Sequence, residues 1–212
     1  MQKNSAKFNL WAKATFDRLS LKLDGHPSIL VFDPNNQTYR EEIINPDNFF
    51  MKLAIAAAEG STCMRGVKKD NHSNYKKDSE NKFINQTRKM GCVIVKDNKL
   101  LSYGTNIQFN GSPLCEELGC LREELNIRSG DQLEKCRTDH AEGIAITKLA
   151  VTELSYSTKN ATMYINAEPC NICAKKISDA QISRIVIIKN KYPNNGLRDY
   201  LNKKIIVDHI EL

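Results

Sequence analysis

The pattern of apolar positions becomes regular after residue 88. From there, β-branched runs alternate with stretches whose apolar residues recur every three or four positions. The runs predict a hairpin over 91–95 and 100–103 and later strands at 161–167, 184–188 and 204–210. The stretches predict helices at 140–154, 169–180 and 197–202. Strands that alternate with helices form a layered sheet with helices on its faces, so the pattern predicts an α/β fold.

The first 88 residues are less regular. Asn45-Pro46-Asp47 has the composition of a helix start and predicts a helix over 47–59. An amphipathic helix at 8–23 and a strand at 28–32 are expected before it, and 67–86 is a polar interruption that we interpret as a solvated loop. We therefore predict an extension (1–46) and a domain (47–212) that carries an insertion loop (67–86).

Composition excludes some classes of protein. The 212 residues are 41% hydrophobic with a net charge of +6, and no apolar run approaches the roughly 18 residues of a membrane span. The basic residues are diluted by acidic ones, which suits a small anion such as a nucleotide better than a nucleic acid. There is no secretory signal, and the seven cysteines are an odd number, so we expect a reducing, cytoplasmic location. Clustered cysteines in such a compartment bind metal more often than they form disulfides.

Two short motifs carry the predicted chemistry, His140-Ala141-Glu142 and Pro169-Cys170-Asn171-Ile172-Cys173. Each stands at the start of a predicted helix, with a strand between them. One His and two Cys give zinc three protein ligands and leave the fourth position to water, whose pKa the metal lowers. Glu142 is predicted to move protons between that water, a ring nitrogen and a departing amine. A Cys-x-x-Cys alone also suits a redox pair or a structural zinc, but the two motifs together are the signature of zinc-dependent nucleobase deaminases.

Beyond these motifs, the sequence from about Asp47 to the C-terminus resembles the deoxycytidylate deaminase family. The resemblance is carried by Gly91–Asp97, Cys115–Asn126, Ser129-Gly130 and Ile182–Val186. It implies a three-layer α/β/α cytidine deaminase-like fold with a central mixed sheet, a catalytic zinc, a homo-oligomer, and hydrolysis of dCMP to dUMP and ammonia. The chain departs from the family in its first 46 residues, in the insertion at 67–86, and in Gly104-Thr105-Asn106-Ile107, which stands where the family has Gly-Tyr-Asn-Gly.

The remaining cysteines suggest a second, structural zinc. Cys92 lies within a predicted strand and is interpreted as a small buried hydrophobe. That leaves a set of four thiols that would complete a closed tetrahedral site: Cys63, Cys115, Cys120 and Cys136. The alternative is four unconnected thiols. If the insertion displaces the first helix, Cys63 does not reach the other three, and His72 is then a weaker substitute.

The substrate contacts are less specific in the sequence. The resemblance makes Asn106 the candidate for binding the sugar 3′-hydroxyl. For the phosphate we choose Arg88, with Arg65 second, because a guanidinium offers a planar fork to phosphate oxygens; a solvated arginine is the alternative.

Other functions remain open from the sequence. The same chemistry suits dCTP, free cytidine, guanine or adenosine in tRNA, and the fold also suits a non-catalytic nucleotide-sensing module. Supply of dUMP and depletion of deoxycytidine nucleotides would use an identical site.

Overall fold

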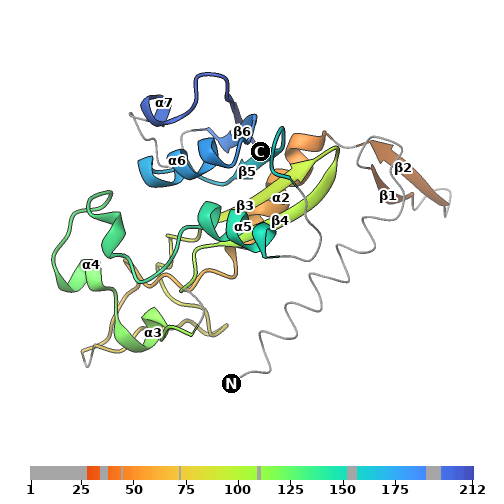
Figure 1. Cartoon of the computed structure of the whole chain (residues 1–212). Helices are drawn as coiled ribbons and strands as arrows, with labels where there is room; N and C mark the ends of the chain where they lie inside the picture. The colour runs from red at the N-terminus through yellow and green to blue at the C-terminus, as the bar shows by residue number, and fades with distance from the viewer. Residues whose placement is uncertain are drawn as a thin grey trace.

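A computed structural model describes residues 28–33, 38–43, 45–71, 73–108, 111–151, 157–189 and 197–212. Its centre is a five-stranded sheet in the order β4-β3-β5-β6-β7 (Figure 1). The strands are β3 (Gly91–Lys96), β4 (Lys99–Thr105), β5 (Thr162–Ile165), β6 (Arg184–Ile188) and β7 (Ile206–Ile210). β3 runs antiparallel to both β4 and β5, whereas β5, β6 and β7 are parallel. The predicted α/β class with a central mixed sheet is confirmed.

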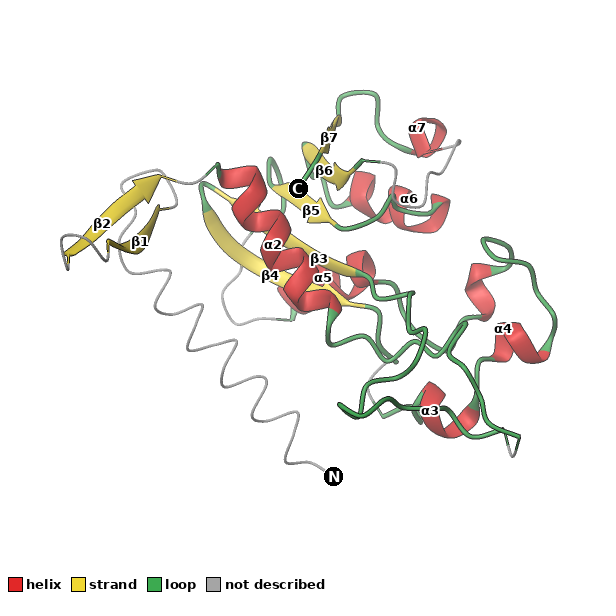
Figure 2. Ribbon diagram, turned by 180° about the vertical axis from the view of Figure 1, so that it is seen from behind, coloured by secondary structure: helices red, strands yellow, loops and turns green. Residues whose placement is uncertain are grey.

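Helices cover both faces of the sheet, which gives three layers (Figure 2). Strand residues alternate between the faces. Val93 and Val95 of β3 pack with α2 (Pro46–Ala58), whereas Cys92 and Ile94 pack with α5 (Ala141–Ala150) and α6 (Asn171–Asp179). The short α7 (Leu197–Tyr200) lies beside α6.

The position of α5 depends on Gly104 in β4. A Cβ atom built on Gly104 would lie 2.0 Å from the carbonyl oxygen of Ala141 and 2.7 Å from the amide nitrogen of Ala145. Only a residue without a side chain lets the helix backbone come this close to the strand. Ser102 of the same strand donates a hydrogen bond to the carbonyl oxygen of Ala145 at 2.7 Å. The first turn of α5 is therefore fixed directly against β4.

Outside the layers, β1 (Ser28–Asp33) and β2 (Thr38–Ile43) pair antiparallel in a sheet of their own. They lie at the end of the structure opposite to α3 (Cys115–Leu118) and α4 (Leu121–Glu124) (Figures 1 and 2). The strand expected at 28–32 is confirmed, while the helix expected at 8–23 lies outside the described residues. No helix among the residues that the structure describes is long and apolar enough to cross a membrane.

Two segments are more ordered than the sequence suggested. The stretch 111–132, for which the apolar pattern predicted no element, contains α3 and α4, and the 3₁₀ turn η1 (Leu133–Lys135) follows it. The insertion at 67–86 is not only a solvated loop: Tyr75 and Phe83 pack against a small buried cluster of Met64, Val67 and Cys115. These aromatic side chains hold the insertion onto the segment that contains α3.

Candidate metal centre and nucleotide pocket

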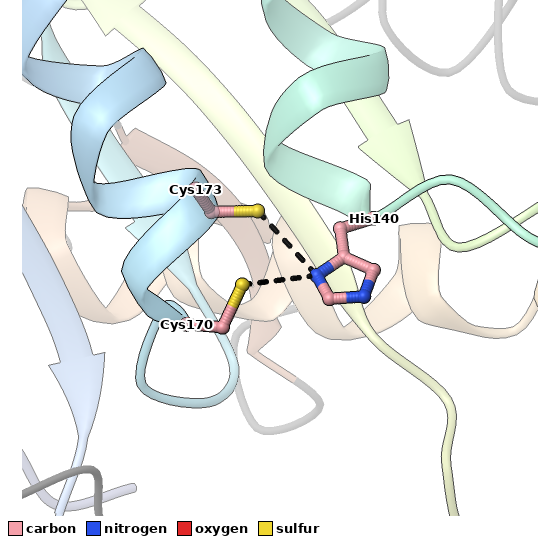
Figure 3. Close-up of side chains that lie close together, drawn as sticks. All are labelled: His140, Cys170 and Cys173. Atoms are coloured by element: carbon pink, nitrogen blue, oxygen red, sulfur yellow. Dashed lines mark hydrogen bonds between the residues drawn. The ribbon is translucent and has the colours of Figure 1, made fainter. Parts of the chain in front are cut away.

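His140, Cys170 and Cys173 come together where two helices begin. His140 is the N-cap residue of α5, Cys170 is the N-cap residue of α6, and Cys173 lies in the first turn of α6. The Nδ1 atom of His140 lies 3.4 Å from each of the two sulfur atoms (Figure 3). Within the described ranges, they form the one group of three or more His, Cys, Asp or Glu residues whose ligand atoms all lie within 4.8 Å of one another.

The geometry of this group fits zinc. Zn–S and Zn–N distances of about 2.3 and 2.0 Å at a tetrahedral angle place nitrogen and sulfur about 3.5 Å apart. The observed 3.4 Å separations match this value, and the donor set of one imidazole and two thiols is one that zinc prefers. The imidazole presents Nδ1 to the sulfurs, so Nδ1 is the nitrogen that would bind the metal.

The group contains a thiolate, the form of cysteine that binds metals. Hydrogen bonds from Cys173 and then from His140 lower the pKa of Cys170 to about 4, although burial opposes the shift. The pKa of Cys173 is raised, because its proton is held in the hydrogen bond to Cys170 and because its sulfur is buried. The hydrogen bond to Cys170 raises the pKa of His140 to about 9 against the effect of burial. The two thiols thus share one thiolate, and the N-terminus of α6 supports that charge.

Glu142 lies beside the three donors in the first turn of α5 and is 4% exposed. Burial raises the pKa of its carboxyl group, and the nearby His140 partly opposes that shift. A buried carboxyl group with a raised pKa takes up a proton more readily than an exposed one, which suits a group that transfers protons.

All four of these groups are close to one cavity of about 720 Å³, and His140, Glu142 and Cys170 line it directly. The volume lies within the range of small-molecule sites. Apolar side chains such as Ile165 and Leu133 share the lining with polar ones. The cavity therefore offers a reactive group of residues next to space for a ligand the size of a nucleotide.

The predicted substrate residues Arg88, Arg65 and Asn106 also line this cavity. Asn106 is 6% exposed, and its side-chain oxygen accepts a hydrogen bond from the Met90 amide at 2.9 Å. Its side-chain nitrogen donates to the carbonyl oxygen of Arg88 at 2.8 Å. Asn106 thus fixes the backbone that carries Arg88, a contact that the sequence did not indicate.

The four cysteines predicted to bind a second zinc lie near one another but not in coordinating positions. Cys63, Cys120 and Cys136 line the same cavity, and Cys115 is buried nearby. Burial raises the pKa of Cys63 to about 12, and the charges of Cys136, Cys120 and Cys115 add to this effect. No three of them meet the 4.8 Å spacing in the described part of the chain, and His72 lies outside it.

Sequence reasoning missed one prominent residue of the cavity. Arg122 lines it and is only 5% exposed. In the sequence Arg122 precedes Glu123 and Glu124, a pattern that is typical of a solvated, charged surface segment. The burial of an arginine on so short a helix depends on tertiary packing, so no local pattern could reveal it.

Comparison with known proteins bears on the chemistry of the cavity. Residues 71–189 match the model of the cytidine and deoxycytidylate deaminase zinc-binding region. The deoxycytidylate deaminase of Schizosaccharomyces pombe is 27% identical over 154 residues, covering 69% of this chain and 40% of that protein. The deoxycytidylate deaminase of Saccharomyces cerevisiae is 31% identical over 144 residues, covering 66% of this chain and 36% of that protein. The chain thus spans two fifths or less of the length of these relatives.

A solved structure has the same fold. The dCMP deaminase from the cyanophage S-TIM5, in complex with dCMP and dUMP, superposes with a TM-score of 0.53 at 19% identity. The superposition covers 79% of this chain and 99% of the other.

Proposed function

The chain belongs to the family of the cytidine and deoxycytidylate deaminase zinc-binding region, and on that premise we propose that it hydrolyses dCMP to dUMP and ammonia. One observation carries the proposal: the Nδ1 of His140 lies 3.4 Å from two thiol sulfurs, beside the buried Glu142, at a cavity of nucleotide size. The names of the two yeast relatives and the ligands of the cyanophage enzyme support dCMP as the substrate.

In this proposal His140, Cys170 and Cys173 hold Zn²⁺. When bound, the metal supplies Lewis acidity and a water molecule of lowered pKa. Glu142 would take one proton from the attacking water and deliver it to the ring nitrogen next to the amino-bearing carbon. It would then take the second proton from the hydroxyl group formed on that carbon and deliver it to the amino group as the carbon–nitrogen bond breaks. The oxygen of water becomes the new carbonyl oxygen, and the amino group leaves as ammonia. The raised pKa of Glu142 suits both halves of this proton transfer.

The finer assignments are also proposals. Arg88 binds the phosphate, and Asn106 binds the sugar 3′-hydroxyl with the second hydrogen of its amide, because the first is donated to Arg88. A second, structural zinc would require Cys63, Cys115, Cys120 and Cys136 to draw closer together than they lie here. Residues 47–212 form the catalytic domain, to which 1–46 are appended, and the chain works as a homo-oligomer in the cytoplasm.

The test is a substrate panel. The zinc-loaded protein is incubated with dCMP, dCTP, deoxycytidine and CMP, and ammonia release is followed beside a Glu142→Ala control. Release from dCMP that disappears in the control is the expected result. Release of ammonia from dCTP alone would support the deamination mechanism but refute the monophosphate as substrate. If zinc is bound but none of the four compounds releases ammonia, the proposal is refuted, and another base or a nucleotide-sensing role is favoured.

A further inference from the structure

A tight turn at 128–131 forms part of the cavity wall. The amide of Asp131 donates to the carbonyl oxygen of Arg128 at 3.2 Å, which closes the turn. Ser129 and Gly130 line the cavity, and Gly130 has a φ of +95°, a backbone conformation that favours glycine. The Oγ atom of Ser129 accepts a hydrogen bond from Nη2 of Arg88 at 3.1 Å. The turn thus meets the arginine already proposed for the phosphate.

Two further arginines donate hydrogen bonds to the main chain of this turn and of the residue before it. Nη2 of Arg122 donates to the carbonyl oxygens of Arg128 and Asp131 at 3.1 and 2.7 Å, so it grips both ends of the turn. Nη2 of Arg65 donates to the carbonyl oxygen of Ile127 at 2.7 Å, just before the turn. Three guanidinium groups therefore converge on one segment of five residues and on one cavity.

Arg65 and Arg122 have no acidic partner among the residues that the structure describes. Every hydrogen bond that Arg65 and Arg122 donate to described residues goes to a neutral main-chain carbonyl. Nη1 of Arg65 and Nε of Arg122 are buried and have no acceptor among the residues that the structure describes. A buried donor without an acceptor, and a buried charge without a counter-charge, are costly. An anion in the cavity that both arginines line would offset the second cost, the charge without a counter-charge.

We propose that the turn at 128–131 is the element that recognises the nucleotide phosphate, with Arg88 and Ser129 contacting the phosphate and Arg122 positioning the turn. This inference rests on the proposed function, because the phosphate is that of the cytosine nucleotide. A guanidinium fork, a hydroxyl group and the amide groups of a turn with positive φ are donors that suit phosphate oxygens. The turn then selects nucleotides over nucleosides, while the metal centre selects the base.

Binding measurements test this inference separately from catalysis. Calorimetry on the zinc-loaded 212-residue chain carrying Glu142→Ala compares dCMP with deoxycytidine, so that neither ligand is consumed. We expect dCMP to bind about tenfold or more tightly than deoxycytidine, because the phosphate gains charge-assisted hydrogen bonds that the nucleoside lacks. Arg122→Met and Gly130→Ala should each remove most of this preference while leaving the affinity for deoxycytidine unchanged.

A matched control is Gly111→Ala. Gly111 has a φ of +81°, and like Gly130 it has no atom within 4 Å of the position of an added Cβ. Both variants therefore strain the backbone without a clash, but Gly111 is not among the residues that line the cavity. Gly111→Ala should keep the preference for dCMP. If Arg122→Met does not fold, Gly130→Ala and Ser129→Ala decide the matter.

The inference is overturned if the parent protein binds both ligands equally, or if the preference for dCMP survives in the turn variants. It is also overturned if the variants weaken dCMP and deoxycytidine by the same factor, which would indicate a merely structural role. Ammonia release by the chain with Glu142 intact is measured in parallel. If no ammonia is released but dCMP still binds more tightly than deoxycytidine, the proposed deaminase activity is refuted and the phosphate-binding turn is retained. If ammonia is released but the preference for dCMP is absent, only the phosphate-binding turn is refuted.

Discussion

Arg184 donates two hydrogen bonds to the carboxylate of Asp47, at 2.7 and 2.8 Å, and so joins β6 to the first turn of α2. Tyr164 of β5 donates to the same carboxylate at 2.8 Å, and Nε of Arg184 donates to Asp208 of β7 at 2.7 Å. None of these residues lines the cavity beside His140, Glu142 and Cys170. The network therefore stabilises the α2 face of the sheet and takes no part in the proposed chemistry.

Asp47→Asn should destabilise the fold in a pH-dependent way. The hydrogen bond from Arg184 is the largest cause of the lowered pKa of Asp47. A carboxyl group whose pKa is lower in the folded state stabilises the fold above its unfolded pKa of about 3.9 and loses that contribution as pH falls through the folded value. We expect the substitution to lower the free energy of unfolding by about 1–2 kcal/mol at pH 7. Urea unfolding measures this.

The difference between Asp47→Asn and the parent should shrink below about pH 3, as the parent's carboxyl group becomes protonated. Glu80→Gln is the control, because the pair of Glu80 and Lys82 is about 70% exposed on both sides and should contribute little at any pH. An equal cost of Asp47→Asn at pH 7 and at pH 2.5 would contradict the assigned ion pair.

Gly104→Ala should be strongly destabilising, because the new methyl group would meet the backbone of α5 at 2.0 Å. Overpacking of this kind costs about 1–3 kcal/mol or more. Gly143→Ala in α5 is the matched control, since its Cβ would approach only the flexible end of the Lys176 side chain, at 3.3 Å. Chemical denaturation of the two variants should show a loss for Gly104→Ala and little change or a small gain for Gly143→Ala. Equal stabilities would mean that α5 does not lie on β4 as described.

Cys170→Ser and Cys173→Ser should each lose the catalytic metal, because a zinc site with three protein ligands cannot spare a thiolate. Metal content after dialysis against a weak chelator measures this. Cys92→Ala is the control: Cys92 is fully buried in β3 and is packed in the core. Loss of zinc from Cys92→Ala alone, with retention in the other two variants, would contradict the assigned ligands.

The zinc content of the Cys115→Ser variant shows whether the chain binds one zinc ion or two. If the second site exists, the parent protein contains about two zinc ions per chain and the variant about one, and the remaining ion is the catalytic one. Deaminase activity should then survive in the variant under conditions where it stays folded. One zinc per chain in both proteins would refute the structural site.

The candidate metal ligands were predictable because each belongs to a short local motif. His140, Cys170 and Cys173 each stand at or near a helix start, and the short Cys-x-x-Cys spacing brings the two sulfurs to one metal without long-range information. The alternation of strand residues likewise predicted which segments form the sheet. The grip of Arg122 on the turn at 128–131 and the bonds of Asn106 to 88–90 depend on how distant segments fold together. No sequence pattern shows them, and the packing of Tyr75 and Phe83 in the insertion was missed for the same reason.

Incubation with dCMP in ¹⁸O-labelled water tests the central claim most directly. The product is analysed by mass spectrometry beside a Glu142→Gln variant that retains its zinc. The account predicts dUMP carrying one ¹⁸O atom for each ammonia released, and a rate about 10²–10⁴-fold lower in the variant, as expected for loss of a general acid–base. Unchanged dCMP in the zinc-loaded parent protein, or equal rates in the two proteins, would contradict it.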